Sequence, residues 1–387
     1  MKEYVKIPAL YMRGGTSKGV YLMTKDLPED PAKRDEVILA IYGSPDIRQI
    51  NGMGGADPLT SKVALLSVSE RENVDIDYTF GYVGIQDRVV DYEGNCGNIS
   101  SGVGVYAILQ GLVKAVEPIT SVRIYNTNTK KIIEASIPVK DGEVVTEGDY
   151  AIDGVPGTGA KIVLNFLNSG GAKTGKLLPT GNVVDEITLK TGKKVRVSLV
   201  DAANPSIFVK AEDIGLTGLE LPQDTETNPE ILAIMEDLRT TAGVMMGLAD
   251  SKEKVGPAVP KVAFVAAPKT YKTTTGAEIR AEEIDLVART KAMAVLHKAY
   301  AVTGGICAST AALIDGTVVN EIVSETAKKS GIVRLGHPSG VLGFEIELLN
   351  EQKKWNLVKA GVSRTAKPIM EGFVYVSRKV FHGEEPK

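Results

Sequence analysis

Cys96 lies where a cysteine could do chemistry, in the polar, glycine-rich segment DYEGNCGNISSGVG (91–104). Free cysteine usually behaves as a small buried hydrophobe. The residues after it, 99–112, are apolar or small on nearly every face, which predicts a buried helix that starts beside the thiol. The N–H groups at a helix start lack partners and carry partial positive charge, so they favour a thiolate and attract carboxylates. An inert buried thiol is the alternative. The candidate anion ligands around the cysteine are Asn95, Gly97 and Asn98.

Lys62 is the second candidate for proton transfer, because it comes directly before the apolar run VALLSV (63–68). The preceding segment NGMGGADPLTS (51–61) predicts a glycine-rich turn whose backbone amides could reach the same anion. A lysine at a strand end is most often solvated. If Lys62 instead points into a cleft, partial desolvation makes proton transfer by its amine feasible. The sequence leaves both possibilities open.

Three further segments have the composition of anion-binding turns. RGGTSKG (13–19) offers hydroxyl groups and a close backbone approach, and GHPSG (336–340) offers an imidazole, a hydroxyl group and a tight turn. Ser309 is expected at the start of a second central helix. Turns are rich in Gly, Ser and Pro for structural reasons alone, but together these segments predict a cleft for a small di- or tricarboxylate. The candidate substrate-binding residues in the two turns are Thr16, Ser17, His337, Ser339 and Gly340.

The two halves of the chain resemble each other, since six pairs of segments recur in the same order. The helical pattern at 35–43 recurs at 229–237, and the run that begins at Lys62 recurs at Lys261. Short β-branched runs separated by helices favour an α/β (α+β) protein with mixed sheets. We expect two pseudo-symmetric domains, each a mixed β-sheet wrapped around a central helix, with the active site in the cleft between them. The expected domains are residues 1–182 and 183–387, with the boundary in the polar segment 169–182.

Cys307 matches Cys96 in this repeat, but its neighbours Ile306 and Ala308 are apolar, which favours simple packing. The alternative is that two facing cysteines act as acid and base on opposite sides of one carbon. That is racemase or epimerase chemistry, and it predicts that removing either thiol is equally damaging.

The composition disfavours several classes of protein. The chain of 387 residues has 43% hydrophobic and 24% charged residues, as ordinary soluble globular proteins do. A net charge of −3 argues against nucleic acid as a partner, and no apolar run reaches the length of a membrane helix. Two cysteines and a start without a secretory apolar segment predict a cytoplasmic protein. No Walker loop, dinucleotide fingerprint or zinc spacing occurs, so we expect neither a cofactor nor a metal.

Five segments together resemble the PrpF-type isomerase family, and the resemblance runs through nearly the whole chain. The segments are RGGTSKGVYL, GADPLTSKVALLS, NCGNISSGVG, GHPSG and SRTAKPIMEG. This family shares the diaminopimelate-epimerase-like fold, which implies two pseudo-symmetric domains here. The resemblance also implies that Lys62 and Cys96 are the catalytic pair, and that Ser17 and the loop from His337 to Gly340 help to bind substrate.

Members of that family move a proton and a double bond in small unsaturated di- and tricarboxylates. The resemblance therefore implies a cofactor-independent allylic isomerase that converts 3-methylitaconate to 2,3-dimethylmaleate. It leaves 2-methylaconitate cis–trans isomerase and 4-oxalomesaconate tautomerase as alternative activities, and a carboxylate-binding protein without catalysis is a further alternative. Exposed sheet edges favour assembly as a homodimer or homotetramer.

Overall fold

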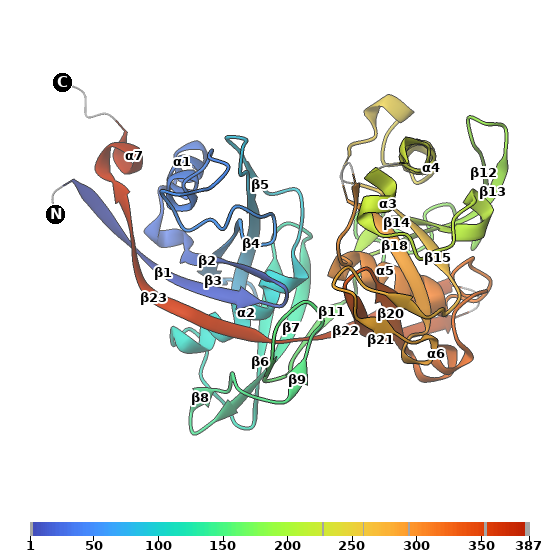
Figure 1. The fold of residues 1–387 in the computed structure, drawn as a ribbon. Coiled ribbons are helices and arrows are strands. Elements are labelled where there is room, and N and C mark those ends of the chain that lie inside the picture. Colours follow the sequence, from blue (N-terminus) through green and yellow to red (C-terminus); the bar gives the residue numbers. More distant parts are fainter. Residues whose placement is uncertain (1–2, 227, 258, 293–294, 352–353, 384–387) are drawn as a thin grey trace. The chain divides into compact units, whose positions relative to one another are not determined.

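The computed structural model describes residues 3–226, 228–257, 259–292, 295–351 and 354–383. The chain divides into two compact units, one formed by Met1–Leu164 with Ser363–Lys387 and the other by Asn165–Val362. Each unit contains a mixed β-sheet and one central helix, labelled α2 and α5 in Figure 1. This architecture confirms the predicted fold class.

The described residues of the first unit form β-strands and three α-helices. Its helices are α1 (Pro31–Tyr42), α2 (Gly97–Leu109) and α7 (Arg378–His382). Its strands are β1 (Tyr4–Gly14), β2 (Ser17–Met23), β3 (Lys62–Val68), β4 (Ile76–Val83), β5 (Val90–Asp91), β6 (Ile119–Asn126), β7 (Lys131–Lys140), β8 (Glu143–Val144), β9 (Tyr150–Ala151), β10 (Thr158–Gly159) and β23 (Ala366–Ser377). Two strands, β11 (Ile162–Leu167) and β22 (Lys354–Arg364), carry the chain from one unit to the other.

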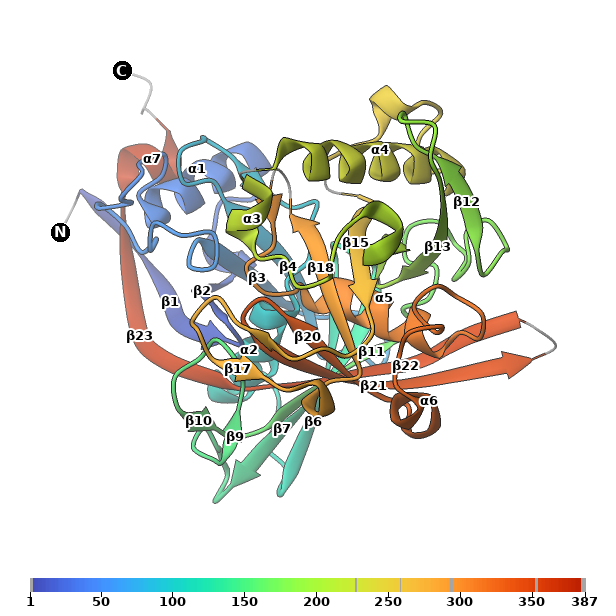
Figure 2. The same cartoon turned by 45° about the vertical axis from the view of Figure 1, so that its right-hand side comes forward.

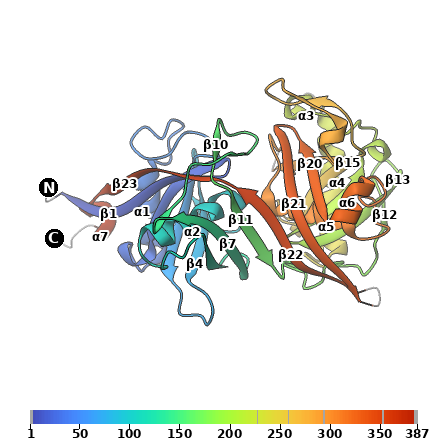
Figure 3. The same ribbon diagram turned by 90° about the horizontal axis from the view of Figure 1, so that it is seen from below.

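The sheet of the first unit is mixed, with strand order β23–β1–β2–β3–β4–β6–β7. The pairs β2–β3 and β4–β6 are parallel, and the other pairs are antiparallel. The long strands β1 and β23 run side by side in Figure 1. Helix α2 packs against strands from both ends of this order, so the sheet curves around it (Figure 3).

The sequences of the two main helices of this unit explain their different surroundings. Helix α1 begins where the Asp30 side chain accepts the Lys33 N–H (2.8 Å), and it ends at Gly43 in the left-handed conformation. One face of α1 packs on the outer side of the sheet through residues such as Ile38 and Ile41. Helix α2 is buried on every side from Ile99 to Ile108, which confirms the prediction from its uniformly small and apolar sequence.

The second unit repeats this plan. Its helices are α3 (Pro222–Glu226), α4 (Pro229–Met245), α5 (Val302–Leu313) and α6 (Glu325–Ser330). Its strands are β12 (Asp185–Thr188), β13 (Lys194–Ala202), β14 (Asn204–Lys210), β15 (Lys261–Ala266), β16 (Tyr271–Lys272), β17 (Glu278–Ile279), β18 (Leu286–Ala292), β19 (Val295–Leu296), β20 (Ile332–His337) and β21 (Gly340–Glu351). Strands β12 to β15, β18, β20, β21 and β22 pair in that order, and again only β14–β15 and β18–β20 are parallel.

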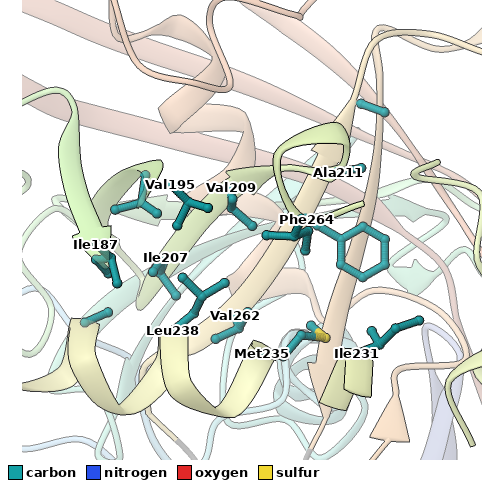
Figure 4. Close-up of a cluster of buried hydrophobic side chains, with 14 of the residues drawn as sticks. Ile187, Val195, Ile207, Val209, Ala211, Ile231, Met235, Leu238, Val262 and Phe264 are labelled. Carbon is teal, nitrogen blue, oxygen red and sulfur yellow. The ribbon is translucent and has the colours of Figure 1, made fainter. Parts of the chain in front are cut away.

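An apolar cluster covers the outer face of the second sheet, where α4 packs across the strands (Figure 2). In Figure 4, Met235 and Leu238 of α4 lie against Val262 and Phe264 of β15. Alternate residues of β15 therefore face α4, and those between them face the central helix. The first residue of β15, Lys261, belongs to the second set.

The two units differ from the predicted division at residue 182. Residues 165–182 belong to the second unit, where Gly170 forms an isolated bridge with Ala202. The chain then returns to the first unit after Val362. The physical reason is the ladder between β23 and β1, which ties the C-terminal strand to the edge of the first sheet. Among the residues that the structure describes, no helix has both the length and the apolar character that crossing a membrane requires.

Candidate active site

Lys62 and Cys96 lie side by side in the first unit. Lys62 Nζ is 3.5 Å from Cys96 Sγ and 2.9 Å from the hydroxyl oxygen of Ser17. Cys96 and Ser17 are buried, and Lys62 is half-buried. The lysine therefore does not extend into solvent, and the geometry places three of the predicted site residues within hydrogen-bonding reach.

The backbone of Lys62 is fixed by its neighbours on two elements. Lys62 opens β3 in register with Gly19 of β2, where a Cβ atom would lie 1.8 Å from the Lys62 carbonyl oxygen. Glycine is therefore required for the two strands to approach. The Tyr42 hydroxyl donates to that same carbonyl oxygen and accepts the Val20 N–H (2.9 Å). Tyr42 is fully buried, and burial raises its pKa, so its hydroxyl group stays a donor.

The glycine-rich loop before Lys62 is organised by a buried side chain, Gln49. Its amide donates to the Ser61 hydroxyl (2.8 Å) and accepts the Ala56 N–H (2.9 Å). Ser61 in turn donates to the Val83 carbonyl oxygen (2.8 Å) on β4. These bonds hold the loop against the sheet and set where β3 begins.

Cys96 is the N-cap residue of α2, as the sequence predicted. Its carbonyl oxygen accepts the Ser100 N–H (3.0 Å) and the Ser100 hydroxyl (2.9 Å), while its side chain gives the first turn no capping hydrogen bond. The N–H groups of that turn are thus not capped by the thiol and carry the positive end of the helix dipole. The Tyr21 hydroxyl donates to the Ile99 carbonyl oxygen (2.6 Å), which anchors the first turn to β2.

Asn95 is held by the turn between β6 and β7. Asn126, which is fully buried, donates to the Asn95 side-chain oxygen (3.1 Å) and accepts from the backbone and hydroxyl of Thr129 (2.8 Å each). In the same turn, Asn128 donates to the Tyr92 carbonyl oxygen (2.8 Å). This asparagine-rich turn therefore supports the loop that carries Asn95 and Cys96, a role that the sequence did not indicate.

Asn98 connects three segments of the first unit. Its Nδ2 donates to the Thr16 hydroxyl (3.0 Å), and its Oδ1 accepts from Arg364 Nε (3.0 Å). Gly15 has a φ of +51°, and a Cβ there would lie 2.1 Å from Asn98 Oδ1. The glycines of RGGTSKG thus let the turn pack against the start of α2. Both polar ends of the Asn98 side chain are engaged within the protein, so it orients its neighbours.

Arg364 is a buried cation beside the site, and sequence reasoning missed it although SRTAKPIMEG contains it. It is 4% exposed, and besides Asn98 it bonds the Ser363 carbonyl oxygen through Nη1 (2.8 Å). Burial lowers the pKa of Arg364 to about 10, and electrostatic interactions with Tyr150 and Cys96 partly oppose that shift. The group therefore stays charged at neutral pH.

The predicted residues His337, Ser339 and Gly340 form a hairpin in the second unit. His337 ends β20 and pairs with Gly340, which opens β21. The His337 Nδ1 accepts the Ser339 N–H (3.1 Å), and the buried Tyr271 hydroxyl bonds the carbonyl oxygens of His337 and Gly340 (2.8 Å each). Ser339 also donates to the Lys298 carbonyl oxygen. The turn is tight and well ordered by hydrogen bonds, and its role in binding substrate stays a prediction.

Ser309 and Cys307 lie inside α5 and not at its start. The helix begins at Val302, so Ser309 is about two turns further on and has no exposed surface. The Cys307 thiol donates to the Val200 carbonyl oxygen (3.2 Å), and burial raises its pKa to about 12. These placements correct the expectation that Ser309 begins the second central helix, and they favour packing as the role of Cys307.

The site contains donors suited to carboxylates and proton transfer. Within the described part of the chain, no group of three or more His, Cys, Asp and Glu side chains is arranged to hold a metal ion. Lys62, Cys96 and Ser17 together offer an amine, a thiol and a hydroxyl group around one point, next to a helix N-terminus. This combination can accept and return a proton while the helix N–H groups bind an anion.

Comparison with known proteins gives relatives that match the full chain. A 3-methylitaconate isomerase from Eubacterium barkeri is 48% identical over 382 residues, which cover 98% of this chain and 99% of that protein. A 2-methyl-aconitate isomerase from Shewanella oneidensis is 40% identical over 390 residues, covering 97% and 98%. These relatives confirm the predicted class of enzyme, an isomerase.

Solved structures agree with the fold. The crystal structure of a methylitaconate-delta-isomerase superposes with a TM-score of 0.87 at 46% identity, covering 100% of this chain and 99% of that one. A hydroxyproline epimerase from Agrobacterium vitis, 13% identical, shares the fold with a TM-score of 0.51 and covers 98% of this chain and 95% of its own. The PrpF protein family matches residues 4–377. With these matches and the geometry around Lys62 and Cys96, the chain belongs to the PrpF protein family.

Proposed function

We propose that this protein is a 3-methylitaconate Δ-isomerase, which converts 3-methylitaconate to 2,3-dimethylmaleate. The observation that carries the proposal is the 3.5 Å separation of Lys62 Nζ and Cys96 Sγ at the uncapped N-terminus of α2. A relative of that name, 48% identical over nearly the whole chain, supports the choice of substrate.

The reaction moves one proton and one double bond. A base removes the proton from the methyl-bearing carbon, which lies between a carboxylate and the alkene. The electron pair of that C–H bond forms the new double bond, and the electrons of the old one take up a proton at the terminal methylene, which becomes a methyl group. The dienolate between the two steps carries extra negative charge on a carboxylate. A carbon acid beside a carboxylate is very weak, so this charge must be stabilised for the reaction to proceed.

The first unit supplies groups for both parts of this chemistry. Cys96 and Lys62 serve as base and acid, and their contact lets a proton pass from one to the other between the two transfers. The Ser17 hydroxyl oxygen accepts a hydrogen bond from the Lys62 amine and so fixes the direction of that amine. The N–H groups of the first turn of α2 bind the carboxylate on which charge develops, and each well-placed donor of this kind contributes about 3–4 kcal/mol to transition-state binding.

Proton NMR in heavy water tests the activity directly. Purified enzyme is mixed separately with 3-methylitaconate, itaconate, 2-methylaconitate and 4-oxalomesaconate, and with several amino acids. We expect the methyl signals of dimethylmaleate to grow with 3-methylitaconate, faster than any product forms from the other acids. Faster conversion of 2-methylaconitate or 4-oxalomesaconate would instead assign the alternative substrate. Deuterium at an amino-acid α-carbon, with the unsaturated acids unchanged, would show racemase chemistry and refute the proposal.

Variants then test the two residues separately. Cys96→Ala and Lys62→Met should each lower kcat by about 100- to 10,000-fold, because each removes one member of the acid–base pair. Lys18→Met is the matched control, since Lys18 lies on β2 next to Ser17 and its amine contacts the Tyr11 ring. Turnover above about a tenth of the wild-type rate in either active-site variant would contradict the role of that residue.

The proposal extends to the conditions of the reaction. We propose that no cofactor is needed, because proton transfer alone balances the reaction. We also propose that the enzyme works in the cytoplasm as a homodimer or homotetramer. Activity that survives exhaustive dialysis against a chelator, and a mass measured by light scattering, test the first and last of these points.

A further inference from the structure

Arg364 is a buried cation without a carboxylate partner. Its side chain is buried, its Nε donates to Asn98 Oδ1, and its Nη1 donates to the Ser363 carbonyl oxygen. The Nη2 group makes no hydrogen bond with any residue that the structure describes, and no acidic side chain there lies within ion-pair distance of the guanidinium. The two N–H donors of Nη2 are therefore left without a partner among the described residues.

Burial of such a cation is costly, and an anion from outside the chain would lower that cost. A buried charge is normally paired, because removal from water costs several kcal/mol that only a partner recovers. Arg239 in the second unit is as deeply buried and is paired with the Glu236 carboxylate at 2.6 Å, whereas the fully buried Arg289 donates to the carbonyl oxygens of Glu220, Ala288 and Gly336. Arg364 has kept its charge without such a partner, with a pKa of about 10. A carboxylate from a bound molecule would complete it.

The position of Arg364 is fixed relative to the proposed reaction centre. Its bond to Asn98 places the guanidinium at the first turn of α2, two residues from Cys96, and its charge interacts with that cysteine. The next residue, Thr365, accepts hydrogen bonds at its carbonyl oxygen from the Gly15 N–H (2.9 Å) and from Arg13 (3.0 Å). The segment is thus anchored to the RGG turn, and the guanidinium is held before any ligand arrives.

We propose that Arg364 is a substrate-binding residue that receives one carboxylate of a dicarboxylate through Nη2, and that it sets the preference for diacids over monoacids. The inference deepens the proposed function and rests on it for the identity of the diacid. An arginine is well suited to this task, since its planar N–H groups match a carboxylate. Asn98 acts as the positioning residue, because its Oδ1 orients the guanidinium and its Nδ2 holds Thr16.

Two kinds of measurement test this role. In steady-state kinetics, Arg364→Gln should raise KM for 3-methylitaconate about 10- to 100-fold with a smaller change in kcat, because a lost charge-assisted hydrogen bond weakens binding by that factor. In calorimetry, the wild type should bind maleate about 10- to 100-fold more tightly than monomethyl maleate, and Arg364→Gln should bind the two alike. Arg88→Gln, at an exposed arginine of the same unit, should change neither result.

The outcomes separate this inference from the proposed function. Equal weakening of maleate and monomethyl maleate binding by Arg364→Gln, or an unchanged KM, would overturn the role of Arg364 while turnover of 3-methylitaconate could still stand. Selective loss of maleate binding in an enzyme that leaves 3-methylitaconate unchanged would support Arg364 and refute the substrate. If Arg364→Gln does not fold, Arg364→Lys keeps the charge without the planar fork. It should then retain turnover with a reduced preference for maleate, and an undiminished preference would refute the inference.

Discussion

Tyr42→Phe removes one oxygen atom that joins α1 to the first residue of β3. The hydroxyl accepts the Val20 N–H at 2.9 Å and donates to the Lys62 carbonyl oxygen, and Tyr42 has no exposed surface. The variant leaves both backbone groups buried without this partner. Each buried group left unpaired costs about 1–3 kcal/mol, so even the lower end gives roughly 2 kcal/mol in the free energy of unfolding. For a unit of this size, that lowers the melting temperature by roughly 4–8 °C.

The same variant should also affect catalysis, because the freed Lys62 backbone lets its amine move away from Cys96. We expect kcat to fall about 10-fold with little change in KM, since a small displacement of an acid–base group acts on the chemical step. Circular dichroism melting and the NMR rate assay measure the two effects, and Tyr375→Phe, at an exposed tyrosine, is the control. A melting temperature and a kcat that match those of the control would refute the proposed anchoring of Lys62.

Three further predictions follow from the packing around the two thiols. Gly15→Ala should abolish most activity, because the new Cβ would lie 2.1 Å from Asn98 Oδ1 and the φ of +51° disfavours alanine; kinetics and a melting curve check this. In the native protein, iodoacetamide should label Cys96 and leave Cys307 unmodified, as mass spectrometry of peptides would show. The variant Cys307→Ala should keep kcat within about twofold of the wild-type value. Burial raises the pKa of Cys307 from 9.0 to about 12, so above about pH 9 the unfolded chain binds fewer protons than the native one. The free energy of unfolding therefore falls with rising pH, by at most about 1.4 kcal/mol per pH unit. Denaturation of the wild type and of Cys307→Ala at pH 8 and 10 should show a smaller fall in the variant.

Local sequence signals were sufficient for the centre of the site. A helix apolar on every face has to be buried, and a polar residue directly before it has to lie at its N-terminus. Those two requirements placed Cys96 correctly. For Lys62 the sequence indicated only the start of a short apolar strand and left its direction open; the structure places its amine beside Cys96.

The rest of the site depends on contacts between distant parts of the chain. Arg364 and Asn98 are 266 positions apart, and the ladder between β1 and β23 and the hydrogen bonds from Gly15 and Arg13 to Thr365 hold their segments together. The sequence repeat could not show that ladder, because it joins the C-terminal strand of one half to the first strand of the other. Ser309 was misplaced for a different reason. The repeat aligns residue types, but Cys307 follows the first residue of α5, Val302, by five positions, whereas Cys96 precedes α2.

The two units preserve the same frame and differ in the residues that do chemistry. In the first unit, Asp75 accepts the Arg123 backbone N–H through Oδ2 (2.7 Å) and donates its own N–H to the Arg123 carbonyl oxygen (2.8 Å). In the second unit, Asp285 and Arg334 form the same two hydrogen bonds (2.7 Å each).

The lysines have diverged in their surroundings. Lys261 opens β15 as Lys62 opens β3, in register with a parallel neighbour, but residue 301 at the N-cap of α5 is alanine. Burial lowers the pKa of Lys261, with Arg239 adding to the shift. Both units therefore share the backbone pairs that hold their strands, while among the described residues the lysine, cysteine and serine that can exchange a proton lie together in the first unit.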